Sequence, residues 1–341
     1  MRFFDLVVTA VDGTVVDLDN TDQMRERYAT PTGGRFPQAR LVTLVACGTR
    51  RVLGAELDSC ALSEQVLWDR MAARLAPGTL NLADRGFFSM NRWLVASGTG
   101  AQLIWRVKNG GRSLPAKVVD TLADGSHLVR LHESDAMLTA RRKAGGNKTA
   151  TRLGDITARL VEFTVTTTDE SGSSRTTRFR VLTTLLDPTK HPAQQVAACY
   201  AERWQVELAY KAIKSTLRGP GRRMRGQTPD LAEQEIWGLL TVYNALVDQA
   251  ITAAVDLGVD PDEISLTVVL AATRDHLAPP CESCGHHAGA RDLTAAITAR
   301  PRNRTNRHRT SPRTTQDRLT QHTQNATYTI TITPTNLPKT A

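Results

Sequence analysis

Three acidic residues stand where carboxylates could hold divalent cations. Asp12 ends an apolar, β-branched stretch near the start of the chain, Asp84 ends a later one, and Glu207 lies in a helical segment. Hard cations such as Mg²⁺ take oxygen ligands, and a metal pair can activate a water or 3′-hydroxyl and stabilise the leaving oxygen of a phosphodiester. The three carboxylates are therefore candidates for metal ligands. One Asp at a strand end is weak evidence, because loops are rich in solvated aspartates.

The segment from Tyr200 to Lys214 supplies a second set of chemical groups. At ~100° per residue, four side chains of this segment fall on one stripe of a helix, within an arc of about 60°. They are the phenol of Tyr200, the guanidinium of Arg203, the carboxylate of Glu207 and the ammonium of Lys214. An acid flanked by cations suits a metal-bound phosphate, because the acid holds the ion and the cations hold phosphate oxygens. A solvated face with spaced ion pairs is the alternative for the charges, but it does not explain the tyrosine.

The elements that must position these residues begin with alternating strands and helices. Apolar runs without helical period predict strands, and amphipathic runs predict helices. We expect strands at 4–16, 41–47, 79–84 and 102–108, and helices at 63–75 and 89–97. Residues 17–37, rich in Asp, Thr, Gly and Pro, predict a long loop. This order predicts an α/β fold with one mixed central sheet.

The second half changes character twice. Alternating residues at 161–165 and a matching strand at 178–186 predict a β-hairpin region inserted into the α/β domain. Helical patterns follow at 192–217, 230–256 and 261–277, with a basic loop at 219–227. We therefore divide the chain into a catalytic core at 1–108, a β-rich insertion at 109–190, a helical second part of the core at 191–278, and a basic tail without regular structure at 279–341.

Composition restricts the partners. The 43 Lys and Arg against 34 Asp and Glu give a net charge of +9, which fits a polyanion such as nucleic acid. No run approaches the ~20 apolar residues of a membrane span, so we expect no membrane partner. Five cysteines, an odd number, predict no disulfide framework and a cytoplasmic location.

Three further motifs are weaker. Asp17-Leu-Asp19-Asn-Thr21 imitates the nucleophile loop of haloacid-dehalogenase-type phosphatases, but a downstream acidic pair is not evident, and a polar loop explains it better. Cys281, Cys284, His286 and His287 have zinc-like spacing within one turn, but zinc modules usually place a second ligand pair well apart and none is nearby, which favours chance spacing. The Arg-rich stretch at 300–318 is either a flexible arm for phosphate backbone or a non-functional tail.

The helical stripe resembles a known signature. Tyr-x2-Arg-x3-Glu-x6-Lys is typical of DDE transposases of the insertion-sequence-four family, and Tyr200, Arg203, Glu207 and Lys214 match it without a gap. Val-Asp12-Gly-Thr resembles the segment of the family's first catalytic Asp, and Leu-Ala-Asp84-Arg-Gly-Phe that of the second. The resemblance covers roughly residues 6–277.

This resemblance implies an RNase H-like mixed central sheet flanked by helices, with a β-strand-rich insertion between the second Asp and the Glu. It implies that Asp12, Asp84 and Glu207 bind two Mg²⁺ ions, with Mn²⁺ as a substitute. It further implies that Tyr200, Arg203 and Lys214 contact DNA near the cut. The implied activity is metal-dependent DNA cleavage and strand transfer at the ends of an insertion sequence. The implied partners are double-stranded DNA, as transposon ends and target, and a second copy in a homodimeric synaptic complex at the bacterial nucleoid.

Two features depart from the family pattern. Relatives usually carry a helical domain ahead of the first catalytic Asp, whereas Asp12 is almost at the start here, so we expect that domain to be missing. Relatives often stack an extruded base on an aromatic of the insertion, where this chain has only Phe163 and Phe179. The aromatic difference argues against a hairpin-forming route. The missing domain favours an alternative hypothesis, a decayed or repurposed transposase that binds DNA without cutting it, and the complete acidic triad argues against that alternative.

Overall fold

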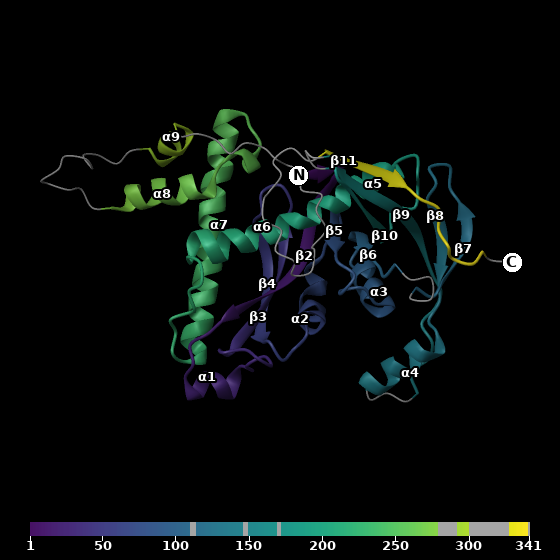
Figure 1. Ribbon diagram of the computed structural model, residues 1–341, viewed down its shortest axis with the longest axis horizontal. Coiled ribbons are helices and arrows are strands. Elements are labelled where there is room, and N and C mark those ends of the chain that lie inside the picture. Colours follow the sequence, from purple (N-terminus) through teal and green to yellow (C-terminus); the bar gives the residue numbers. More distant parts are fainter. Residues whose placement is uncertain (110–113, 146–148, 169–171, 279–291, 300–326, 340–341) are drawn as a thin grey trace, which may run out of the picture. The chain divides into compact units, whose positions relative to one another are not determined.

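A computed structural model of the chain describes all residues except 110–113, 146–148, 169–171, 279–291, 300–326 and 340–341 (Figure 1). The chain forms two compact units, which we call unit 1 and unit 2. Unit 1 consists of Met1–Arg2, Val7–Met71 and Arg203–Arg307. Unit 2 consists of Phe3–Leu6, Ala72–Glu202 and His308–Ala341. Each unit thus combines segments that are far apart in the sequence.

The strands of unit 1 form an antiparallel arrangement. After the short β1 (Arg2–Phe3), β2 (Leu6–Asp17) pairs with β3 (Gln38–Ala46), and β3 pairs with β4 (Val52–Ser59). Asp12 lies opposite Thr43 in this register. The prediction that Asp12 ends its strand is therefore wrong, because the β-branched residues after it continue the ladder as far as Asp17. Asp12 instead lies mid-strand, where backbone pairing on β3 holds it in place.

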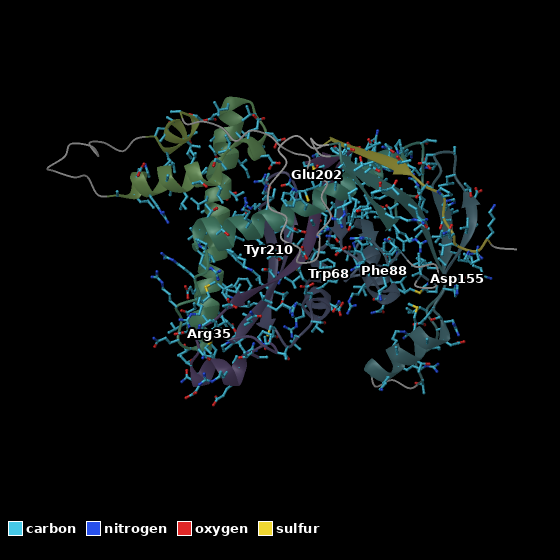
Figure 2. All side chains as sticks on the ribbon, in the orientation of Figure 1. Arg35, Trp68, Phe88, Asp155, Glu202 and Tyr210 are labelled. Atoms are coloured by element: carbon cyan, nitrogen blue, oxygen red, sulfur yellow. The ribbon has the colours of Figure 1, made fainter. Side chains whose placement is uncertain are left out.

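Unit 1 has one short helix inside the predicted loop and another after β4. Helix α1 (Asp22–Arg27) lies inside residues 17–37, capped by the Thr21 side chain, which accepts a hydrogen bond from the Met24 amide. Met24 is fully buried, and this single apolar anchor fixes a helix too short to show a periodic pattern. Helix α2 (Glu64–Met71) follows β4 and buries Trp68 (labelled in Figure 2).

The longest helix of unit 1, α7 (Pro229–Leu257), starts at the Thr228 cap and ends at Gly258, whose φ of 62° is left-handed. By length and composition alone it is long and apolar enough to cross a membrane, which differs from the expectation that the sequence holds no run of this kind. Its first turns pack into a buried cluster with β2 and α1, and its last turns into another with α8 (Leu266–Leu277) and α9 (Leu293–Thr298). Its buried residues recur at helical spacing from Ala232 to Ala254, and 39% of its most apolar stretch is buried, so the helix packs on the core through one face.

The helical run from 193 to 217 is not one α-helix. Helix α5 (Ala193–Ala201) is followed by a 3-10 turn at Glu202–Trp204, then by α6 (Gln205–Lys211) and a π-helical turn at Ala212–Leu217. The prediction of a continuous helix with a uniform ~100° step is therefore wrong, because the tighter and wider turns change the rotation per residue. Contacts, rather than a helical wheel, decide which side chains converge.

Unit 2 holds a mixed sheet with the strand order β5-β6-β10-β9-β8-β7. Its strands are β5 (Thr79–Ala83), β6 (Gln102–Arg106), β7 (Ala116–Thr121), β8 (His127–Leu131), β9 (Ile156–Thr168) and β10 (Ser174–Thr183). Strands β5 and β6 are parallel, as expected for a connection through α3 (Met90–Gly98), and the later pairs are antiparallel. The expected β-rich region is thus a continuation of this sheet. Helix α4 (Asp135–Ala144), which the sequence analysis did not predict, lies between β8 and β9.

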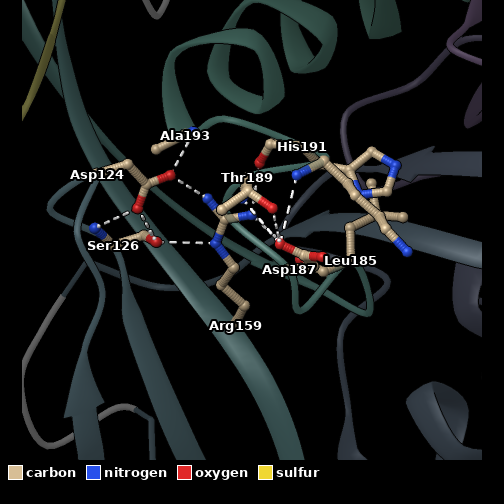
Figure 3. Close-up of polar contacts among 9 residues, drawn as sticks. Asp124, Ser126, Arg159, Leu185, Asp187, Thr189, His191 and Ala193 are labelled. Atoms are coloured by element: carbon tan, nitrogen blue, oxygen red, sulfur yellow. Dashed lines mark hydrogen bonds and ion pairs between the residues drawn. The ribbon is translucent and has the colours of Figure 1, made fainter.

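A buried guanidinium fixes the entry to α5 (Figure 3). Arg159 of β9 is fully buried, and it donates to the backbone oxygens of Leu185 and His191 and forms an ion pair with Asp124. The same Asp124 carboxylate accepts the Ala193 amide at the first turn of α5, at 2.7 Å. The β7–β8 turn, β9 and the start of α5 therefore share one polar cluster.

The predicted tail contains regular structure at 293–298 and 327–332. Strand β11 (Thr327–Ile332) pairs antiparallel with β9 at residues 163–168, beyond the stretch of β9 that β8 covers. Thr335 then donates to Glu162, a fully buried carboxylate that also pairs with Arg180. Together with α9, these residues differ from the expected absence of regular structure at 279–341. The Cys281–Cys284 motif and the Arg-rich stretch at 300–318 lie outside the described residues.

Candidate active site

The carboxyl group of Asp12 is the most enclosed acidic group of the predicted site. Its side chain is 12% exposed, and one carboxyl oxygen accepts the Gly13 amide at 2.9 Å. Burial raises the pKa of Asp12 to about 6, against the lowering effect of the Arg203 guanidinium, and the nearby Glu207 carboxylate adds to the rise. A buried carboxylate of this kind is stabilised in its charged form by a cation that replaces the water it has lost.

Arg203 joins two of the three predicted ligands. Its guanidinium donates to Asp12 at 3.3 Å and to Glu207 at 3.1 Å. All three side chains are mostly covered, with exposures between 12% and 22%. The 3-10 turn before α6 places Arg203 and the first turn of α6 places Glu207, so the strand and the helix meet at this ion-pair bridge.

A tyrosine that the sequence analysis missed ties α6 to the strand. Tyr210 is buried (labelled in Figure 2), and its hydroxyl donates to the Asp12 backbone oxygen at 2.6 Å. The same hydroxyl accepts hydrogen bonds from the Thr43 amide and side chain at 3.2 and 2.9 Å. Tyr210 follows Glu207 by three positions, so helical spacing was the signal available for it. It fixes the backbone that carries Asp12.

Lys214 also reaches β2, from the π-helical turn. Its ammonium donates to the Thr14 hydroxyl and to the Val15 backbone oxygen, each at 2.9 Å. Burial and the neighbouring Arg218 charge lower the pKa of Lys214. Thr14 and Asp12 are two residues apart on one strand, so they share a face. Of the predicted stripe, Arg203 and Lys214 therefore contact β2 and Glu207 lies beside Arg203, on three differently wound turns, whereas Tyr200 belongs to unit 2.

On the opposite face of β2, the side chain of Glu64 lies against Gly13 of the Asp-Gly motif. A side chain at Gly13 would place its Cβ 2.5 Å from Cδ of Glu64, so the Glu64 side chain would have to move to admit it. Glu64, at the start of α2, pairs with Arg40 at 3.2 Å and contributes to the raised pKa of Asp12. Glu64 is a further carboxylate beside β2, and no short sequence motif predicted it.

Asp84 and Tyr200 lie in unit 2, where a chain of contacts connects them. Asp84 directly follows β5, as predicted, and accepts a hydrogen bond from Arg106 at 3.5 Å. The Arg106 guanidinium lies over the Phe179 ring, 4.7 Å from its centroid. The Tyr200 ring lies 6.3 Å from that of Phe179, which also stacks on Phe163 at 5.3 Å. The two insertion aromatics therefore pack as a pair beside Tyr200.

The donor set suits a hard divalent cation in its chemistry. Asp12 and Glu207 offer carboxylate oxygens to the same Arg203 cation, and carboxylates are the ligands that Mg²⁺ and Mn²⁺ prefer. Within the part of the chain that the structure describes, no group of three or more His, Cys, Asp or Glu side chains is arranged to hold a metal. Unit 1 thus supplies two of the three predicted ligands, and unit 2 carries Asp84.

Comparison with known proteins agrees with this pattern. Residues 4–245 match the family model described as the transposase DDE domain. The chain is 28% identical over 273 residues to the transposase InsG for insertion sequence element IS4 of Escherichia coli K12, which covers 77% of this chain and 56% of InsG. It is 39% identical over 77 residues to the putative transposase InsL for IS186A of the same organism, covering 22% of this chain and 20% of InsL. The chain thus spans about half the length of InsG.

One solved structure is similar at low identity. A piggyBac transposase synaptic complex with hairpin DNA, determined by cryo-EM, matches with a TM-score of 0.42 and 10% sequence identity. The match covers 81% of this chain and 55% of that one.

Proposed function

This chain belongs to the transposase DDE domain family, and from that premise we propose that it cleaves and rejoins DNA at the ends of an insertion sequence with Mg²⁺ or Mn²⁺. Members of this family use divalent metal in general. We assign the metal ligands to Asp12, Asp84 and Glu207 on an RNase H-like sheet. The observation that carries the proposal is the bridge of Asp12, Arg203 and Glu207, because an enclosed acid with a raised pKa faces a second carboxylate across one cation.

The residues of unit 1 would divide the work between them. Asp12 and Glu207 would hold the divalent ion, which when bound supplies an activated oxygen nucleophile and stabilises the leaving oxygen. Arg203 balances both carboxylates and presents a guanidinium to phosphate oxygens as DNA enters. Tyr210 and Lys214 hold the strand and the helical run in register through the backbone of β2. The site is thereby positioned before substrate arrives.

Three proposed DNA contacts follow from the family pattern. Tyr200 and Arg203 would lie against the DNA backbone near the cut, and Lys214 would reach it from its position against β2. We also propose double-stranded DNA as substrate and target, and a homodimer in the complex that joins two ends. A DNA-binding derivative that no longer cuts is the competing function.

The decisive experiment replaces Glu207 with Gln. We expect Glu207→Gln to lower Mg²⁺-dependent cleavage of end-labelled duplex from the DNA flanking the reading frame by at least ~100-fold, because a metal ligand is lost. Affinity for the same duplex in EDTA should change less than about threefold. Cleavage is read on denaturing gels and affinity by fluorescence anisotropy.

The matched control is Glu26→Gln, which removes an exposed carboxylate on α1 and should leave both quantities unchanged. Equal loss of cleavage and of binding in Glu207→Gln would assign that residue to folding. A wild-type chain that binds the duplex but never cuts it, with Mg²⁺ or with Mn²⁺, would favour the competing function.

A further inference from the structure

A basic loop follows the π-helical turn of unit 1. This is the basic loop of residues 219–227, and its turns depend on Gly219 and Gly221, with φ of 96° and 66°. Met224 is buried among residues of β2, α1 and α7, and its amide donates to the Asp17 backbone oxygen at 3.1 Å. The following residues are held from α7, where Glu235 accepts the Arg225 amide at 2.6 Å. The loop is therefore fixed at its base while its arginines face outward.

This loop borders an open hollow of about 620 Å³ in unit 1. The residues that line it are Asp19, Gly221, Arg222, Arg223, Met224 and Arg225. Three exposed guanidinium groups therefore face one carboxylate, and the net charge of the lining is positive. Within the described part of the chain, the guanidinium groups of Arg222 and Arg225 have no hydrogen-bond or ion-pair partner.

The third arginine is oriented in advance. Arg223 donates to Asp19 at 3.0 Å, and its guanidinium carbon lies 4.4 Å from the centroid of the Phe36 ring. Stacking of this kind holds the plane of a guanidinium while leaving several N–H donors available. Arg35 also lies over the Phe36 ring, at 5.5 Å, and adds a further positive charge.

We propose that this hollow binds the phosphodiester backbone of DNA, as a site separate from the Asp12 and Glu207 carboxylates. Fixed arginines with free donors match phosphate oxygens, which accept two parallel N–H bonds from one guanidinium. A backbone contact of this kind carries no base sequence and serves to hold the duplex in register. Asp19 opposes it, because its carboxylate occupies Arg223 and repels phosphate.

The test measures affinity for a random-sequence 30-base-pair duplex by fluorescence anisotropy across a salt series in EDTA. Arg222→Ala/Arg225→Ala should lower the slope of log K against log salt by about 2, since each lost phosphate contact removes ~0.9. The control Arg51→Ala/Arg70→Ala removes two exposed arginines engaged by Asp248 and Asp58, and should leave the slope unchanged. Asp19→Asn should tighten binding by up to ~5-fold, because a repelling charge is gone.

Equal slope losses in both double variants would overturn the site, since they would report net charge alone. Unchanged or weaker binding by Asp19→Asn would overturn it too, and this variant retains all the loop arginines. Displacement of the duplex by polyglutamate as effectively as by unlabelled DNA would indicate a site for acidic peptides instead.

The inference rests on the proposed function in taking DNA as the partner, but its measurement involves no cleavage. If the Arg222→Ala/Arg225→Ala slope change is seen but the wild-type chain never cuts DNA, the proposed reaction is wrong and the phosphate site stands. If the wild-type chain cuts DNA and the double variant leaves the slope unchanged, the phosphate site is wrong and the proposed reaction stands.

Discussion

At the scale of single residues, the cost of keeping Asp12 ionised is the property of the site most open to measurement. The pKa of this carboxyl is raised from 3.8 to about 6 in the folded chain, because burial penalises the charged form. The unfolded chain therefore loses its proton at lower pH than the folded chain does. Folding stability from this group is greatest below pH ~4 and is lost as pH rises to about 6.

We expect Asp12→Asn to be more stable than the wild type, and increasingly so as pH rises. A pKa rise of about two units corresponds to ~3 kcal/mol at pH 7.5 and to ~1.5 kcal/mol at pH 5, where the folded carboxyl is still mostly protonated. Urea unfolding in EDTA at the two pH values measures the difference. Asp155→Asn, which removes an exposed carboxylate, is the control.

A variant less stable than wild type at pH 7.5 would show that the Arg203 bridge outweighs desolvation. A stability gain that does not vary with pH would place its origin in packing. Either result would remove the physical reason for a cation at Asp12.

The site residues that the sequence could predict are those that belong to a motif of fixed spacing. Spacing indicated Arg203, Glu207 and Lys214, and the structure places Arg203 and Lys214 in contact with β2 and Glu207 beside Arg203. Tyr210 and Glu64 escaped notice because their roles depend on contacts across the fold, with Thr43 and with the space above Gly13. The sequence of α6 and α2 alone contains neither contact.

At the scale of elements, β11 completes the β9 edge. Strand β9 is longer than β8, and the residues that extend past it would expose unpaired backbone groups without β11. We expect a chain that stops at residue 326 to lose amide protection at alternate positions of 163–168. The intervening amides should stay protected, because they face β10 across an intact ladder.

Hydrogen exchange followed by NMR reads each amide separately. Unchanged protection throughout 163–168 would show that β11 adds nothing to this edge. Loss at every position would show that the β9–β10 pair itself depends on β11.

Element types were more predictable than their limits. Thr228 and Gly258 bound α7 as cap chemistry predicts, and β-branched runs predicted β2 and β3. The short α1 and the 3-10 and π turns around α6 were not predictable, because tertiary contacts stabilise them: the buried Met24 for α1, and the hydrogen bonds of Lys214 to β2 for the π turn.

At the scale of the whole molecule, the net charge of +9 predicts how DNA affinity responds to salt. With roughly four phosphate contacts, the slope of log K against log salt is about −3.6, and affinity should fall ~100-fold between 50 and 200 mM NaCl. A salt titration with an unlabelled random duplex measures this. A fall of less than ~5-fold would mean that the positive charges act within the protein rather than on DNA.

The pairing of β11 with β9 also implies a delay during synthesis, because β9 is made well before the strand that pairs with it. Glu162 leaves the ribosome 173 residues before Thr335, the residue that caps its carboxylate. At ~5–20 residues per second this delay is about 10–35 s. Throughout it the edge of β9 stays open, and an open edge is a template for another chain. On a polysome, where nascent copies stand side by side, the translating chain is therefore the form of this protein most exposed to misassembly.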